Sequence, residues 1–195
     1  MKYKIIVCAL TLIIIFGGVI RFSCINKEMQ IYASVEKKYN IGDEVPFEND
    51  IFFYGDERAN GYSITVLDTS YISIDEFKDK YHISLDDTLL EFSDYVYMVR
   101  ANFKNSNGND DGRTGVNVNQ LILQETSFIT YPDKTAFMLL NDFDYLTFSL
   151  SPKKEREFII PFGINKDYIN INNLINGDTR LVVTLYPNKK TICLN

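Results

Sequence analysis

An alternation of apolar and polar side chains recurs along most of the chain and constrains its fold more than any other feature. Tyr62, Ile64 and Val66 fall on one face of an extended segment, and polar residues fall on the other face. The segment from residue 95 to residue 103 repeats this pattern, with Arg100 and Asn102 on its polar side. Such alternation is typical of a β-strand with one buried face. The sequence therefore predicts half-buried strands at these places.

Further strands are expected, with turns between them. Alternation or short apolar runs occur at residues 51–54, 118–124, 128–131, 146–150, 158–162, 181–185 and 191–194. Turn-forming pairs such as Asn60-Gly61 and Asn176-Gly177 separate these segments. Pro161 has no N–H to donate, so its strand is expected at a sheet edge or at a bulge. Many short strands predict a mainly β fold, an immunoglobulin-like antiparallel β-sandwich.

One short helix is expected from Ser73 to Tyr81. Ser73 and Glu76 have the spacing of a capping box, in which each side chain accepts a hydrogen bond from the other residue's backbone. Ile72 and Phe77 are placed to pack against each other as a hydrophobic staple. We expect this helix to close one end of the sandwich in a structural role.

The first residues predict a membrane anchor. As a helix, the apolar run from Ile5 to Ile20 would be about 24 Å long, and Tyr3 and Phe22 extend it to about 30 Å, the thickness of the hydrocarbon core. The lysines near the amino terminus favour an orientation with that end inside the cell. We therefore expect a single-pass signal-anchor helix over residues 4–22, in the cell membrane.

Two other interpretations of this segment stay open. A cleaved signal peptide would have a shorter apolar core and a small-x-small cleavage site. A lipoprotein signal would place a cysteine after a Leu-x-small sequence; Ser23 and Cys24 fit, whereas Arg21 and Phe22 do not. All three interpretations place the rest of the chain outside the cytoplasm. The expected organisation is an anchor over residues 1–28, a stalk over 29–38 and the β-sandwich over 39–195.

The charge distribution separates the anchor from the external body. The chain has 20 Lys and Arg residues and 26 Asp and Glu residues, for a formal charge of −6. Residues 1–28 are net cationic, so the remainder is more acidic than the whole chain. Phosphate binding requires a surplus of cations, which argues against nucleic acid as a partner. The acidic body is also expected to be repelled by anionic lipid.

Several short motifs, in this order along the chain, resemble a known family. They are Gly17–Phe22, Tyr39–Phe47, Asn60–Val66, Ile74–Tyr81, Tyr95–Asn105 and Leu185–Lys190. The sequence resembles a Firmicute family of uncharacterised membrane-anchored proteins, domain-of-unknown-function family 5028, and its layout is similar to extracellular immunoglobulin-like modules. The resemblance implies an amino-terminal anchor and an external β-sandwich. It implies no known activity and supplies no catalytic or binding residues.

One loop is similar to a calcium-binding loop. Asn107, Asn109 and Asp111 occupy alternating positions before Gly112. A complete EF-hand loop would end in a bidentate glutamate, where this chain has Val118. We interpret residues 107–111 as a solvated loop between strands and leave calcium binding open.

The other reactive side chains form no recognisable catalytic pattern. His82 has Asp86 and Asp87 nearby in sequence, but no G-x-S-x-G nucleophile elbow is present, so a surface or loop histidine is expected. Cys24 and Cys193 could form a disulfide or remain free thiols. Carboxylates that a glycosidase could pair are Asp43, Glu44, Glu48, Asp50, Asp56, Glu57, Asp142 and Asp144. We assign no catalytic, cofactor-binding or metal-binding residue and expect no cofactor.

These observations favour a non-enzymatic binding or interaction module at the cell surface. Its partner would be an extracellular protein or glycan, bound by sheet edges and by the loops around Asn60, Asn107 and Asp142. The strand near Pro161 is the expected edge for such a contact. The alternatives are an extracytoplasmic hydrolase with paired carboxylates and a purely structural envelope component.

Overall fold

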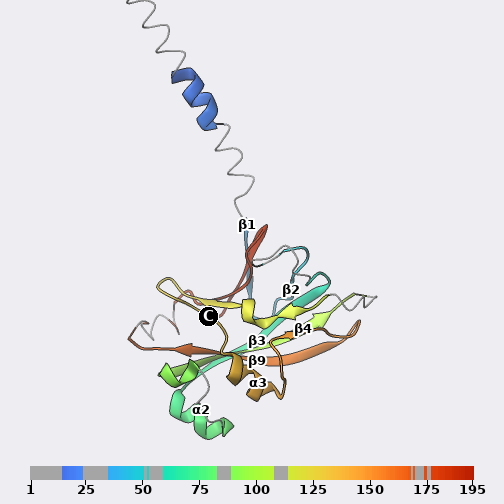
Figure 1. The fold of residues 1–195 in the computed structure, drawn as a ribbon, viewed down its shortest axis with the longest axis vertical. Coiled ribbons are helices and arrows are strands. Elements are labelled where there is room, and N and C mark those ends of the chain that lie inside the picture. Colours follow the sequence, from blue (N-terminus) through green and yellow to red (C-terminus); the bar gives the residue numbers. More distant parts are fainter. Residues whose placement is uncertain are drawn as a thin grey trace, which may run out of the picture. The chain divides into compact units, whose positions relative to one another are not determined.

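A computed structural model (Figure 1) describes residues 15–23, 35–50, 52, 59–82, 89–107, 114–167, 169, 174 and 177–195. The chain divides into two compact units, Met1–Ser34 and Val35–Asn195. In the first unit residues 15–23 form a helix. No helix within the described ranges is long and apolar enough to cross a membrane. Residues 4–14 of the predicted anchor lie outside the described residues, so the anchor stays a prediction.

The second unit is built mainly from strands. They are β1 (Val35–Asn40), β2 (Val45–Pro46), β3 (Tyr62–Ser73), β4 (Tyr95–Asn105), β5 (Val116–Asn117), β6 (Ile122–Gln124), β7 (Ile129–Thr130), β8 (Thr147–Phe148), β9 (Glu155–Ile164), β10 (Arg180–Thr184) and β11 (Asn188–Cys193). The helices are α2 (Ile74–Tyr81) and α3 (Lys134–Asn141), with 3-10 turns η1 (Leu89–Phe92) and η2 (Val118–Gln120). The prediction of a mainly β fold is confirmed.

The strands form two principal sheets and one small one. The five-stranded sheet has the order β1-β11-β10-β6-β7, and the four-stranded sheet has the order β2-β3-β4-β9. Strand β1 pairs parallel with β11, and the other pairings in these two sheets are antiparallel. Strands β5 and β8 form a separate two-stranded sheet. Figure 1 shows the long strands β3, β4 and β9 side by side.

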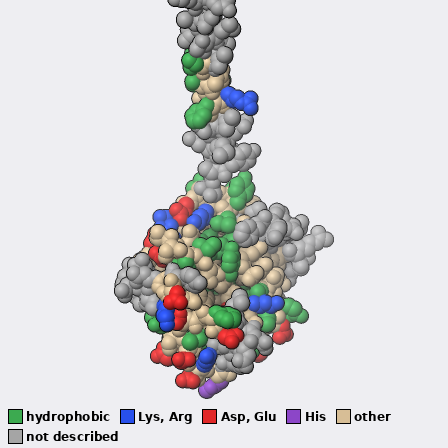
Figure 2. Space-filling view, turned by 60° about the vertical axis from the view of Figure 1, so that its left-hand side comes forward, with side chains coloured by type: hydrophobic (Ala, Val, Ile, Leu, Met, Phe, Trp, Pro, Cys, Tyr) green, Lys and Arg blue, Asp and Glu red, His purple; other side chains and the backbone are tan. Residues whose placement is uncertain are grey.

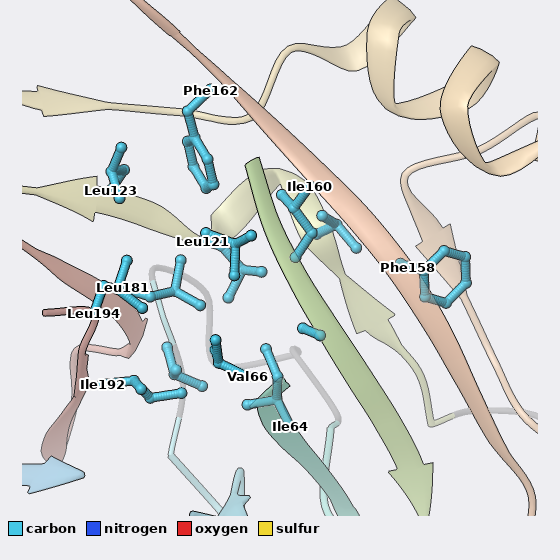
Figure 3. Packing of buried hydrophobic residues seen from close by; sticks show 14 of the residues in the cluster. Ile64, Val66, Leu121, Leu123, Phe158, Ile160, Phe162, Leu181, Ile192 and Leu194 are labelled. Atoms are coloured by element: carbon cyan, nitrogen blue, oxygen red, sulfur yellow. The ribbon is translucent and has the colours of Figure 1, made fainter. Parts of the chain in front are cut away.

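The main core lies between the two principal sheets, as in a β-sandwich. Ile64 and Val66 of β3 are fully buried in it, and the inward residues of β4 and β9 continue the same face. Figure 3 shows Ile160 and Phe162 of β9 directed toward Leu123 of β6, which belongs to the other sheet. The alternation predicted along β3, β4 and β9 is therefore confirmed.

A second apolar cluster covers the opposite face of the four-stranded sheet. Val96 and Met98 of β4 point away from the main core and pack with Phe77 of α2 and Ala136 of α3. Figure 1 shows both helices on one side of this sheet. The capping box of α2 forms as predicted, with Ser73 Oγ accepting from the Glu76 N–H. The helix, however, covers a sheet face rather than an end of the sandwich.

Two local predictions hold only in part, each for an identifiable reason. The segment 118–124 is a single turn of 3-10 helix followed by β6, because the Asn117 side chain accepts a hydrogen bond from the Asn119 N–H and caps η2. The register of β10 shifts between Val182 and Thr184, and Leu185 therefore packs in a small cluster on the other side. Helix α3 was missed.

Candidate functional site

A groove of about 710 Å³ is present in the sandwich unit. It lies where η2, β7, the start of α3 and β9 meet. Its lining residues are Leu90, Ser93, Asn117, Asn119, Gln120, Ile129, Thr130, Tyr131, Pro132, Asp133, Lys134 and Gly163. We call this the amide groove, because three carboxamide side chains from one short segment line it.

A second hollow of about 330 Å³ shares a wall with the amide groove. Asn117, Asn119 and Lys134 line both, and the second hollow adds Asp144 and Tyr145 among its residues. The two hollows therefore adjoin each other at these three residues.

Exposed rings and alkyl groups lie among these polar side chains. Ile129 is 58% exposed, Tyr131 44% and Tyr145 69%, although each is large and apolar. Binding sites for small polar ligands combine apolar and aromatic side chains with a few polar groups such as Asn and Gln amides. Carboxamides both donate and accept hydrogen bonds, and rings supply flat apolar contact.

The floor of the groove is rigid because α3 starts there. The Asp133 N–H donates to the Pro161 carbonyl at 2.9 Å, and Asp133 Oδ1 accepts from the Ala136 N–H at 2.8 Å. Asp133 is thus a buried helix cap, and this use explains its carboxylate in the groove wall. Gly163 also lines the groove, and a Cβ atom there would displace Ser93 Oγ.

The predicted edge at Pro161 is confirmed, but it is not open for a partner strand. Strand β9 ends the four-stranded sheet, and the Pro161 carbonyl is already bonded to Asp133. The Asn141 amide covers the next outward position. Its Oδ1 accepts from the Ile159 N–H and its Nδ2 donates to the Ile159 carbonyl, both at 2.8 Å. Strand addition at this point of the edge, which the sequence suggested, is therefore blocked.

The three loops proposed as binding elements have mainly structural contacts. Asn107 Nδ2 donates to the Asn60 carbonyl at 2.8 Å, and the Asn107 N–H donates to Asn105 Oδ1 at 2.9 Å. Asp142 is the left-handed C-cap of α3. Asn60, Asn107 and Asp142 do not line the amide groove, whereas Asp144 lines the second hollow beside it.

The remaining candidates gain no chemical role. Asn109, Asp111 and Gly112 lie outside the described residues, so the solvated loop stays a prediction and calcium binding stays open. Within the ranges that the structure describes, no group of three or more His, Cys, Asp or Glu side chains could hold a metal. His82 is exposed as the left-handed C-cap of α2. Cys193 carries a half-buried free thiol, and Cys24 is not among the described residues.

The carboxyl groups with a resolved pKa shift are all shifted downward in the part of the chain that is described. A hydrogen bond from the Ser63 hydroxyl lowers the pKa of Glu44, and bonds from Ser127 lower that of Glu125. Lys166 and Arg180 likewise lower the pKa values of Asp94 and Asp178. A general acid requires the opposite shift.

Two of the predicted carboxylates, Glu48 and Asp50, are brought together, but around a lysine rather than in the groove. Both contact Lys190 Nζ at 2.6 Å. Sequence reasoning missed Lys190. Its signal is a lysine in phase with Ile192 and Leu194, two residues of the main core.

The surface seen in Figure 2 gives no sign of a single large docking patch. Hydrophobic side chains appear as several small groups among polar and charged ones. We therefore take the amide groove as the candidate binding site.

The comparisons with known proteins identify a family and nothing finer. A family model described as a domain of unknown function, DUF5028, matches residues 36–190. No curated protein and no solved structure matches the chain. The matched segment covers most of the sandwich unit that begins at Val35. The family assignment made from the short ordered motifs is thus confirmed, and the chain belongs to the DUF5028 family.

Proposed function

We propose that this protein is a non-enzymatic binding module held at the outer face of the cell membrane, and that the amide groove is its binding site. The observation that carries the proposal is the groove itself, with carboxamides on one wall and exposed tyrosines beside it. An uncharged ligand rich in hydroxyl groups matches this lining best. We therefore name a glycan chain as the ligand class, with an extended peptide as the competing outcome.

The membrane location rests on the sequence of the first unit. The apolar run from Ile5 to Ile20, with lysines before it, supports a single-pass anchor with the amino terminus inside. The acidic composition of the remainder supports a body that stands clear of anionic lipid. Recovery of the full chain in washed membranes, and degradation of its β domain by protease added to intact cells, would test this. Recovery in the cytosolic fraction would contradict it.

The finer fold assignment is also a proposal. The two-sheet sandwich, with its first strand β1 parallel to its last strand β11, supports an immunoglobulin-like relationship. The pairing of β2 with β3 in one sheet is a departure from that arrangement, in which the second and third strands lie in different sheets.

The hydrolase alternative lacks a supporting observation. The carboxylate inside the groove, Asp133, caps α3 and is buried. Asp144 borders the neighbouring hollow, and a glycosidase needs a second carboxyl group at a set distance from the first.

The groove is tested with the full chain in detergent, titrated with cell-wall oligosaccharides and monitored by calorimetry. Tyr131→Ala removes an exposed ring from the groove and should weaken binding at least tenfold. Tyr186→Ala is the matched control, because both tyrosines are 44% exposed and Tyr186 does not line the groove. Equal affinity of the two variants would exclude the amide groove as the site. If peptides bind and oligosaccharides do not, the ligand class is an extended peptide rather than a glycan chain.

A further inference from the structure

Lys190 has its whole side chain buried between the sheets, and four oxygen atoms surround its amine. Nζ lies 2.6 Å from the Pro46 carbonyl, 3.3 Å from the Phe47 carbonyl, and 2.6 Å from both Glu48 Oε2 and Asp50 Oδ2. The side chain of Lys190 is 0% exposed and that of Asp50 is 3% exposed. Amine and carboxyl group are thus held together away from solvent.

The local backbone is shaped to deliver both carboxylates to this amine. Glu48 has the positive φ of 57°, uncommon for a residue with a side chain, and the Asp50 N–H donates to the Phe47 carbonyl at 3.1 Å. This tight turn after β2 places Glu48 and Asp50 around Lys190 of β11. Positions held in such a conformation are often functional.

The contact between Lys190 and Asp50 is close but is not a hydrogen bond. Oδ2 of Asp50 is a buried oxygen without a hydrogen-bond partner in the described chain, although Nζ is 2.6 Å away. The amine therefore approaches the carboxyl group from a direction outside the hydrogen-bonding range. A buried pair of this kind is costly as two separate charges, and proton transfer from Nζ to Oδ2 removes both.

The other oxygen of Asp50 is held by two donors. Oδ1 accepts from Asn188 Nδ2 at 2.9 Å and from the Asn188 N–H at 3.3 Å. Two N–H groups directed at one oxygen draw electron density from the carboxyl carbon and would stabilise negative charge on that oxygen during attack. Asn188 lies two positions before Lys190 on β11, so one strand supplies both the nucleophile and the donors.

From this geometry we propose that Lys190 and Asp50 form an intramolecular amide bond after folding. The neutral Lys190 amine attacks Cγ of Asp50, and the developing charge on Oδ1 is held by Asn188. Glu48 accepts a proton from Nζ and returns it to Oδ2, which leaves as water. One N–C bond forms, one C–O bond breaks, one water molecule is released, and no oxidant or cofactor is required.

The bond would join the turn after β2, in one half of the sandwich, to the last strand of the other sheet. Strand β11 also pairs with β1, the first strand of the unit. The cross-link would therefore fix the first and last parts of the domain together, which suits a body attached at one end. This inference is independent of the amide groove and of any ligand.

The test is mass spectrometry of the full chain, folded and then digested with trypsin. The expected product is a branched peptide in which the Tyr39–Arg58 segment is joined to the Lys190–Asn195 segment, with the loss of one water mass. The mass is measured on this peptide and not on the whole chain, so processing at the amino terminus does not affect the result. Fragment ions should assign the link to Asp50 and Lys190.

Glu48→Gln keeps the size of the side chain but removes its ability to accept the proton, so the branched peptide should be lost or form at least a hundredfold more slowly. Glu44→Gln is the matched control, because Glu44 and Glu48 have side chains 51% and 52% exposed, and it should cross-link like the wild type. A folded wild-type chain that yields only the two linear peptides would overturn the proposal. A link to a carboxyl group other than Asp50, or full cross-linking of Glu48→Gln, would overturn the assignment of residues.

Discussion

Two parts of the interior hold the sandwich together by opposite means. Around Phe158, rings from different elements pack together: Phe148 at 4.6 Å, Phe137 at 5.5 Å and Phe103 at 5.9 Å between centroids. Around Lys190, an amine is enclosed by carbonyl and carboxylate oxygens. The stability of the ring cluster depends on the volume and shape of its side chains, whereas that of the lysine cluster depends on each polar partner. Two equally buried sites can therefore differ in how well they tolerate a substitution.

The largest expected effect is at the lysine cluster. Lys190→Met fills similar space but leaves the Asp50 carboxylate buried without a cation, and it also removes the proposed cross-link. A carboxylate left buried without a partner costs about 3–5 kcal/mol, and a cross-link that closes a long loop contributes about 5 kcal/mol more. Chemical denaturation of the full chain should show a loss of at least about 3 kcal/mol in the free energy of unfolding.

The double variant Lys190→Met/Asp50→Leu separates the two contributions. It also lacks the cross-link, but no charge is left buried, so it should be more stable than the single variant by about 3 kcal/mol. A double variant no more stable than Lys190→Met would show that the unpaired carboxylate is not the cause, and the contrast with the ring cluster would fail.

The ring cluster should respond next most strongly. Phe158→Ala removes the ring that contacts four other phenylalanines, Phe103, Phe137, Phe143 and Phe148. The expected loss is about 3–5 kcal/mol, from lost transfer energy and the remaining cavity, measured by thermal or denaturant unfolding. Phe92→Ala is the control, since Phe92 is 74% exposed and should change stability by less than about 0.5 kcal/mol. Similar losses for both would contradict the assigned core.

The same contrast explains which features the sequence could predict. Inward residues such as Ile64, Val99 and Ile160 follow a period of two, because burial of one sheet face depends only on apolar character. The capping box at Ser73 was predictable because its partners are three residues apart. Lys190 was not, since its oxygen partners lie at residues 46–50 and only the fold brings them near. The amide groove was missed for the same reason.

The polar contacts of Asn141 at the edge of β9 test the intermediate case. Asn141→Ala leaves the Ile159 N–H and carbonyl without their side-chain partner, although water can reach a partly exposed edge. The expected loss is about 1–3 kcal/mol, smaller than at Lys190. Amide hydrogen exchange at Ile159 should accelerate while exchange at Val99 does not. Unchanged exchange at Ile159 would contradict the proposed covering of this edge.

Glu125 provides the smallest and most local effect. Its carboxylate accepts from the Ser127 hydroxyl at 2.6 Å and from the Ser127 N–H at 2.9 Å, and these bonds lower its pKa from the ordinary value of 4.5. A lowered folded-state pKa stabilises the fold above the ordinary pKa, and this contribution is lost as the pH falls through the folded value. Ser127→Ala should therefore raise the pKa of Glu125 and destabilise the protein near neutral pH but hardly in acid.

A carbon-13 titration of the Glu125 carboxyl, with unfolding measured at neutral and acidic pH, checks this prediction. Ser151→Ala, at an exposed hydroxyl, serves as the control and should leave the titration unchanged. The Ser127 partner is two residues from Glu125, so both residues can adjust locally when the hydroxyl is removed. The oxygen partners of Lys190 come from a distant part of the sequence, so no local rearrangement can replace them. A destabilisation by Ser127→Ala that matched Lys190→Met would show that burial alone, and not the sequence separation of the partners, sets the cost.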